Sequence, residues 1–188
     1  RGKPTVHKKY GVNAGILSGD LMMVLALKLA SEKNGVVQKE QYDLMIQTSI
    51  ELYEGQQYDV EFEERNDVKQ EEYIKMIELK TAVLLGCALK MGAIVANASA
   101  AYQDKIYEFG RNIGLSFQIQ DDYLDTFGDA QVGKKIGGDI LNNKKTLLLI
   151  SALQKGNAVQ KAALEKWIAT DNDDDAKIKA VSQLYIET

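Results

Sequence analysis

Cysteine, histidine and proline are almost absent from this chain, which has one of each among its 188 residues. A lone cysteine, Cys87, cannot form an internal disulfide. It fits a reducing compartment such as the cytoplasm, where we expect the protein to reside. With His7 as the one histidine, the sequence lacks the ligands of an ordinary zinc site. Because Pro4 is the one proline, long stretches of the chain are free to be helical.

Positive charge is also scarce, since 23 Lys and Arg face 27 Asp and Glu and the formal net charge is -4. A protein that binds nucleic acid needs a broad basic face to meet the phosphate backbone. We therefore expect no nucleic-acid partner. Lysines with a functional role should be few and local.

One long apolar stretch, from Ala82 to Ala101, has the length of a membrane span. It is interrupted by Gly86, Lys90 and Asn97. Its neighbouring segments are amphipathic and the whole chain is hydrophilic on average, so we expect a buried central helix here. The sequence accordingly predicts no integral membrane segment.

Apolar residues recur at spacings of three and four along most of the chain, and alternating strand patterns of any length are hard to find. Breaks fall at Asn34-Gly35, at Asn66-Asp67, near Asn97 and through the loop from Gly128 to Asn143. The helices predicted between them cover residues 14–31, 38–64, 70–90 continuing to about 98, 100–123, 146–153, 158–169 and 174–185. We predict an all-α fold, a single-domain helical bundle.

Three aspartates, Asp121, Asp122 and Asp125, end an apolar helical stretch that reads Phe-Gln-Ile-Gln-Asp-Asp-Tyr-Leu-Asp. Residues four apart on a helix share a face, with about 5–6 Å between their Cβ atoms. Asp121 and Asp125 would thus present paired carboxylates to one space, where a cation between them would relieve their repulsion. Oxygen ligands of this kind suit Mg²⁺, which takes one or two carboxylates and shares its other sites with substrate phosphates. Taken alone, the same motif also fits a solvated acidic helix end.

Further motifs surround these aspartates in a set order. They are Arg1-Gly2-Lys3-Pro4-Thr5-Val6-His7, Gly55-Gln56-Gln57-Tyr58-Asp59, Lys80-Thr81, Gly133-Lys134-Lys135-Ile136-Gly137-Gly138-Asp139-Ile140 and Asn143-Lys144-Lys145-Thr146. Together with the aspartates they resemble the polyprenyl synthetase family of trans-prenyl diphosphate synthases, which includes the farnesyl and geranylgeranyl diphosphate synthases. The match extends over roughly Arg1 to Leu153. Each motif alone is weak, but several in the family's order form a strong signal.

The resemblance implies the isoprenoid synthase type of helical bundle around a central cavity, with residues 1–188 forming the C-terminal portion of a polyprenyl synthetase domain. It implies a prenyltransferase that condenses isopentenyl diphosphate with an allylic diphosphate by metal-assisted ionisation. The product would be a short- or medium-chain trans-prenyl diphosphate, the cofactor Mg²⁺ and the assembly a homodimer. The family's first aspartate-rich motif precedes the segment that Arg1 to His7 resembles, so we expect an incomplete active site in this chain alone.

The resemblance also assigns roles to residues. Asp121, Asp122 and Asp125 would bind the metal, with Asp121 and Asp125 as the direct ligands because they share a face. The diphosphate groups would be bound by Arg1, Lys80, Lys134 and Lys144, with Lys134 chosen over Lys135 because it follows Gly133.

Lys80, Thr81 and Gln118 are the predicted catalytic residues. The oxygen dipoles of Thr81 and Gln118 would steady an allylic cation without attacking it. Without the resemblance, Gln118 also fits a plain hydrogen bond between helices. Four further residues are expected nearby, Gln56 and Asp59 as cavity-lining hydrogen-bond partners and Phe117 and Phe127 as apolar walls.

Three other interpretations remain at this stage. A terpene cyclase shares the aspartate-rich metal site, but the Lys80-Thr81 pair and the loop from Gly133 to Thr146 favour the synthase. A non-catalytic partner subunit of a prenyl diphosphate synthase could keep the fold. A helical scaffold could carry the aspartates as mere surface groups.

Overall fold

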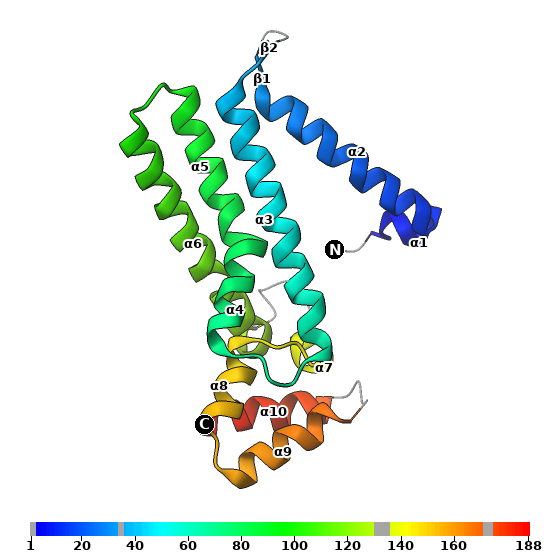
Figure 1. Cartoon of the computed structure of the whole chain (residues 1–188). Coiled ribbons are helices and arrows are strands. Elements are labelled where there is room, and N and C mark those ends of the chain that lie inside the picture. The colour runs from blue at the N-terminus through cyan, green and yellow to red at the C-terminus, as the bar shows by residue number, and fades with distance from the viewer. Residues whose placement is uncertain (1–2, 34–35, 130–135, 171–174) are drawn as a thin grey trace.

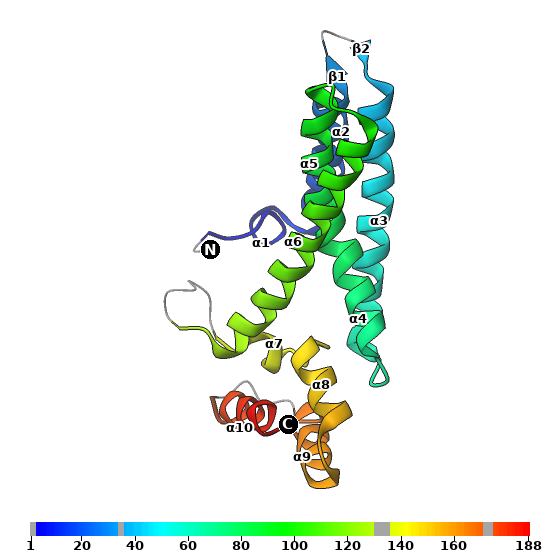
Figure 2. The same cartoon turned by 90° about the vertical axis from the view of Figure 1, so that its left-hand side faces the viewer.

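The computed structural model describes residues 3–33, 36–129, 136–170 and 175–188 (Figure 1). Three long helices, α3 (Lys39–Glu64), α5 (Val83–Val95) and α6 (Ala100–Phe127), lie side by side in an elongated bundle. The C-terminal helices gather at one end of this bundle, as both Figure 1 and Figure 2 show. At the opposite end, helix α2 (Val12–Ser31) leaves the bundle at an angle.

The all-α prediction is confirmed, since the described residues form helices apart from one short antiparallel pair of strands. The remaining elements are α1 (Val6–Tyr10), β1 (Glu32–Lys33), β2 (Val36–Val37), α4 (Gln70–Ile77), the π-helical turn η1 (Glu78–Ala82), α7 (Gly138–Leu141), α8 (Leu147–Lys155), α9 (Ala158–Ile168) and α10 (Asp175–Glu187). The predicted helices agree with these bounds to within a few residues. The short helices α1 and α7 and the π-helical turn were not predicted.

Helix α8 joins two hydrophobic clusters. Ile150 packs with apolar residues from the end of α3 and from α4, including Phe62 and Ile77. Its neighbour Leu149 points to another side of the helix and packs with residues of α7, α9 and α10, such as Leu164. Helix α8 thus links the C-terminal helices to the main bundle, and α7 and α10 also contact α6 directly.

Helix α5 contacts both α3 and α6 and has the central place that the sequence predicts, but it is only partly buried, since Leu84, Leu89 and Val95 are exposed. Val83, Gly86, Cys87, Ala93 and Ile94 are all buried in it. The cysteine is 2% exposed and belongs to the core, as its apolar neighbours indicate. The apolar stretch from residue 82 to 101 is not one helix, because α5 ends before Asn97, which has a φ of 53°.

Helix α2 is the one described helix that is long and apolar enough to cross a membrane by length and composition. Most of its apolar side chains are exposed, among them Leu17, Leu21, Met22 and Leu29. Helices of this length and hydropathy also occur in the cores of soluble proteins. In this chain α2 packs against α1 and α3 and leaves a broad apolar face uncovered.

Two glycines bring η1 into close contact with its neighbours. A Cβ atom at Gly114 of α6 would lie 2.5 Å from the Cα of Ala82, and one at Gly55 of α3 would overlap the backbone nitrogen of Lys80. The backbones of α3 and α6 can therefore approach η1 from both sides. Single π-helical turns within α-helices are frequent at functional sites, and this one carries Lys80 and Thr81.

The close approach at Gly114 predicts the effect of adding one methyl group. Gly114→Ala should destabilise the fold by about 1–3 kcal/mol, because the backbone of Ala82 must move to make room. Urea denaturation measures this difference in unfolding free energy. The matched control is Gly92→Ala in α5, where a Cβ meets nothing within 4 Å and a gain of roughly 0.5–1 kcal/mol is expected from helix propensity. Equal effects of the two substitutions would contradict the packing at η1.

Candidate functional site

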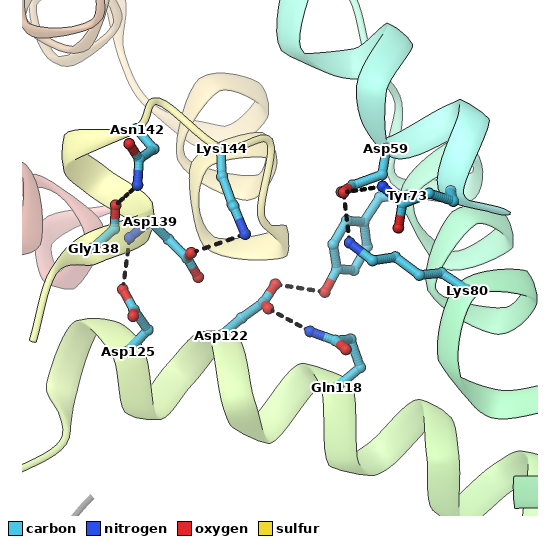
Figure 3. A network of polar contacts seen from close by, with 11 residues as sticks. Asp59, Tyr73, Lys80, Gln118, Asp122, Asp125, Gly138, Asp139, Asn142 and Lys144 are labelled. Atoms are coloured by element: carbon cyan, nitrogen blue, oxygen red, sulfur yellow. Dashed lines mark hydrogen bonds and ion pairs between the residues drawn. The ribbon is translucent and has the colours of Figure 1, made fainter. Parts of the chain in front are cut away.

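A pocket of about 140 Å³ lies between α3, α4, η1, α6 and the turn that precedes α8. Its lining combines acidic, cationic and apolar side chains. The acidic residues are Asp59, Glu63, Asp121, Asp122 and Asp139, the cationic ones are Lys80, Lys144 and Lys145, and the others are Phe62, Tyr73, Met76, Ile77, Gln118 and Thr146. Opposite charges therefore share one hollow with an apolar surface. Figure 3 shows the polar part of this arrangement.

Lys80 projects from the π-helical turn and forms an ion pair with Asp59 of α3, with 2.5 Å between Nζ and Oδ2. Both side chains are partly exposed to the pocket, at 30% for Lys80 and 22% for Asp59. The predicted place of Asp59 on the cavity wall is thus confirmed by its position. Gln56 is exposed, contacts the carboxylate of Asp59 at 3.5 Å and does not line the pocket, so its expected place on the cavity wall is wrong.

Asp122 is 6% exposed, and both of its carboxylate oxygens accept hydrogen bonds. The hydroxyl of Tyr73 donates to Oδ2 at 2.6 Å, and the amide of Gln118 donates to Oδ1 at 3.1 Å (Figure 3). Burial raises the pKa of Asp122, and these two hydrogen bonds lower it. Burial also raises the pKa of Tyr73, and the neighbouring negative charge of Asp122 adds to this effect.

The oxygen of the Gln118 amide accepts a hydrogen bond from the hydroxyl of Thr81 at 3.0 Å. A chain of hydrogen bonds thus runs from Tyr73 of α4 through Asp122 and Gln118 of α6 to Thr81 of η1. The predicted grouping of Lys80, Thr81 and Gln118 agrees with their positions. Their role in catalysis stays a prediction.

Asp139 and Lys144 form an ion pair across the turn after α7, with 3.5 Å between charged atoms. Burial raises the pKa of Asp139 despite the lowering effect of Lys144. Burial by itself would lower the pKa of Lys144, but the carboxylates of Asp139 and Asp59 outweigh it, so this pKa is raised. Burial lowers the pKa of the adjacent Lys145, whose Nζ donates to the carbonyl of Asn143 at 3.4 Å.

Asp125 does not share a space with Asp121 as the helical spacing predicts. Asp121 lines the pocket, whereas Asp125 is 4% exposed and lies against the start of α7. Its Oδ2 accepts a hydrogen bond from the backbone nitrogen of Asp139 at 2.8 Å, and its carbonyl accepts one from Gly137 at 2.6 Å. A carboxylate in this position satisfies backbone donors at a helix start. Helical spacing within α6 cannot predict this contact, because Asp139 of α7 lies 14 residues further along the chain.

Within the described ranges, no three acidic, histidine or cysteine side chains converge to form a metal site by themselves. Metal binding by Asp121, Asp122 and Asp125 therefore stays a prediction. Phe117 is 56% exposed and does not line the pocket, so its expected role as an apolar wall is wrong. Arg1, Lys134 and Lys135 lie outside the described residues.

The turn before Lys144 is supported by the C-terminal helices. Asn143 has a φ of 52°, and its side-chain amide donates to the carbonyl of Ile168 at 3.1 Å. Lys177 of α10, only 1% exposed, donates to Oδ1 of Asn143 at 2.9 Å and to the carbonyl of Thr170 at 3.1 Å. Neither Lys177 nor Tyr73 was predicted, because a lysine on an amphipathic helix is typical of a surface and a tyrosine at apolar spacing is typical of a core.

Comparison with known proteins places these motifs in one family. Residues 1–185 match the family model described as polyprenyl synthetase. A short chain isoprenyl diphosphate synthase of Methanothermobacter thermautotrophicus is 38% identical over 183 residues, which are 96% of this chain and 55% of that protein. A geranylgeranyl diphosphate synthase of Saccharolobus solfataricus is 40% identical over 94% of this chain and 54% of that protein. The chain thus spans about half the length of these relatives.

Solved structures show the same fold. The crystal structure of a geranylgeranyl pyrophosphate synthase superposes with a TM-score of 0.91 at 43% identity, over 99% of this chain and 58% of that one. That of a geranylgeranyl pyrophosphate synthetase from Pyrococcus horikoshii superposes with a TM-score of 0.89 at 34% identity, over 100% and 57%. The described helices therefore have the all-α arrangement of these synthases.

The buried bond between Tyr73 and Asp122 predicts a pH-dependent change in stability. At neutral pH, Tyr73→Phe should lower the unfolding free energy by about 1–3 kcal/mol, because a buried carboxylate loses a donor. The pKa of Asp122 should rise further in this variant, since the Tyr73 bond lowers it. Protonated Asp122 has less need of the donor, so the difference from the wild type should shrink as the pH falls through the raised pKa of Asp122.

Urea denaturation of both proteins from about pH 8 down to about pH 4 measures this difference. Tyr102→Phe provides the control, because Tyr102 is 57% exposed on the same helix as Asp122. Its effect should be close to zero at every pH. A Tyr73→Phe deficit that stays constant across the range would show that the bond does not depend on the charge of Asp122.

Proposed function

The chain belongs to the polyprenyl synthetase family, and on that premise we propose that it forms part of a prenyltransferase. The reaction joins isopentenyl diphosphate to an allylic diphosphate, with loss of the allylic diphosphate group, and yields a short- or medium-chain trans-prenyl diphosphate. The observation that carries the proposal is the pocket in which lysines, aspartates and apolar side chains meet. A substrate with an anionic head and a hydrocarbon tail requires this combination.

The lysines suit the anionic head of the substrate. Lys80, Lys144 and Lys145 reach the pocket from two sides, Lys80 from η1 and the other two from the turn before α8. A flexible ammonium group can follow a diphosphate as charge develops on the leaving oxygen. Arg1 and Lys134 would add to this group, as the family resemblance implies.

The carboxylates suit a divalent cation that is shared with the substrate. Asp121 and Asp122 line the pocket from α6, and Asp139 faces it from α7. Mg²⁺ commonly takes one or two carboxylates and completes its coordination with water and phosphate oxygens, so these residues fit that ion. When bound, it would supply Lewis-acid neutralisation of the departing diphosphate. Because Asp121 lines the pocket whereas Asp125 faces α7, we place the direct contact at Asp121.

Lys80, Thr81 and Gln118 surround the place where the allylic cation would form. The amide oxygen of Gln118 and the hydroxyl oxygen of Thr81 are dipoles with partial negative charge, held in place by the hydrogen bond between them. Phe62, Met76 and Ile77 provide an apolar surface that excludes water from this region. A non-catalytic partner subunit has no need of such a set of charged groups, so the pocket supports the enzyme.

We also propose a homodimer in which a second copy covers the apolar face of α2. The residues Leu17, Leu21, Met22 and Leu29 are exposed and form an apolar surface on the described part of the chain. Two such helices packed together would bury apolar area on both copies.

One prediction of this proposal tests the metal and diphosphate site. Mg²⁺ together with a bisphosphonate should raise the unfolding free energy of this chain, by about 2.7 kcal/mol when the free ligand is 100-fold above its Kd. Asp121→Asn should remove most of this gain. The control is Asp104→Asn on the same helix, where Asp104 is 69% exposed and pairs with Lys90. An unchanged gain in Asp121→Asn would refute the assignment, and product chromatography of the full-length protein with both diphosphates tests the reaction itself.

Another prediction tests the proposed dimer interface at α2. Leu21→Glu places a charge in the exposed apolar face and should convert a dimer into a monomer. Light scattering coupled to size-exclusion chromatography measures the mass of the wild type and the variant. Ile186→Glu in α10, where the isoleucine is 67% exposed at the other end of the molecule, should leave the dimer intact. A wild type that is monomeric at every concentration would contradict the proposal.

A further inference from the structure

We infer that Asp122 is a positioning residue that fixes which end of the Gln118 amide faces Thr81. The inference deepens the proposed function and rests on it, since it gives the Gln118 oxygen its direction toward a developing cation. The chain of hydrogen bonds through Asp122, described above, supports it. Tyr73 donates to the other oxygen of Asp122 (Figure 3).

The orientation of an amide side chain follows from what its neighbours can donate or accept. Oδ2 of Asp122 accepts from the Tyr73 hydroxyl at 2.6 Å, and Oδ1 faces the Gln118 amide at 3.1 Å. An ionised carboxylate only accepts hydrogen bonds, so both oxygens of Asp122 are acceptors. Gln118 must present its NH₂ group to Asp122, because two oxygens facing each other at this distance would repel.

This orientation also determines where the amide oxygen of Gln118 lies. Oε1 of Gln118 points away from Asp122 and accepts a hydrogen bond from Thr81 at 3.0 Å. An amide oxygen has two lone pairs, so one remains after this bond. With the opposite orientation, the same position would hold an NH₂ group, whose partial positive charge would disfavour a cation nearby.

The residues joined by these hydrogen bonds are held in place by packing. Tyr73 is 1% exposed within the cluster that contains Phe62 and Ile77, so its hydroxyl cannot turn to water. Thr81 sits in η1, which is wedged between two helices at Gly55 and Gly114. The direction of the Gln118 amide is therefore set before any substrate arrives.

The substitution Asp122→Asn separates orientation from packing, because it changes charge and donor pattern but hardly changes shape. The buried hydroxyl of Tyr73 needs an acceptor, so the amide oxygen of the substituted side chain should face Tyr73 and its NH₂ group should face Gln118. Gln118 should then flip, accept from residue 122 and donate to the Thr81 hydroxyl, which can also accept. All these groups stay hydrogen-bonded, but the dipole of the Gln118 amide is reversed.

NMR of the 188-residue chain without ligands detects the flip directly. In the wild type, the side-chain amide protons of Gln118 should show nuclear Overhauser contacts to Asp122 and Tyr73. In Asp122→Asn they should show contacts to the methyl group of Thr81. The matched control is Tyr73→Phe, which weakens the same network but keeps the carboxylate, so Gln118 should retain its wild-type contacts.

Kinetics of the full-length protein provide the second readout. Asp122→Asn should lower kcat by roughly 10²-fold while the KM values for both diphosphates change by less than about threefold. Tyr73→Phe should lower kcat by less than about tenfold. Equal losses in both variants would assign the network a purely structural role and overturn the inference.

The two readouts also separate this inference from the proposed function. If Gln118 keeps its contacts to residue 122 in Asp122→Asn, the inference fails even when the full-length enzyme is active. If Gln118 flips as expected but no prenyl transfer is found in the wild type, the orienting role of Asp122 stands and the proposed function fails.

Discussion

The rest of the site depends on the burial of one carboxylate, that of Asp122. A buried charge without partners is strongly unfavourable, so the fold must bring donors to it from elsewhere in the chain. Tyr73 comes from α4 and Gln118 from one turn earlier on α6, and together they satisfy both oxygens. The bond between Tyr73 and Asp122 thus links α4 to α6 at the pocket. The same bonds determine the direction of the Gln118 amide and, through it, the environment of Thr81.

Close helix packing makes this arrangement possible. Gly55 and Gly114 allow α3 and α6 to approach η1 so closely that no side chain fits between them. The π-helical turn then carries Lys80 and Thr81 toward the pocket from the middle of an otherwise continuous helical segment. On the opposite side, the buried Lys177 and the two clusters joined by α8 hold the turn with Lys144 and Lys145. The ammonium groups of these lysines therefore lie at the ends of long side chains, while packing holds the backbone that carries them.

Much of the fold and part of the candidate site could be predicted from the sequence. The period of the apolar residues predicted helices whose bounds agree closely with α2, α3, α6 and α9. The motifs around Lys80, Gln118 and Lys144 predicted residues that do line one pocket, although they are far apart in the chain. The predicted pairing of Asp121 with Asp125 in one space was wrong, because Asp125 lies against the start of α7. The expected role of Phe117, which faces solvent, was also wrong, and Tyr73 and Lys177 were not predicted.

The sequence by itself determined the helical class, the family and the residue types that meet the chemistry of diphosphates and metal ions. These properties depend on local periodicity and on motifs, which can be read directly from the order of the residues. Only the tertiary structure decided which carboxylate faces the pocket, which is buried against another helix, and which way the Gln118 amide points. Burial and hydrogen-bond direction depend on partners 14 to 49 residues away, such as Asp139 for Asp125 and Tyr73 for Asp122, and no local pattern specifies those distances in space.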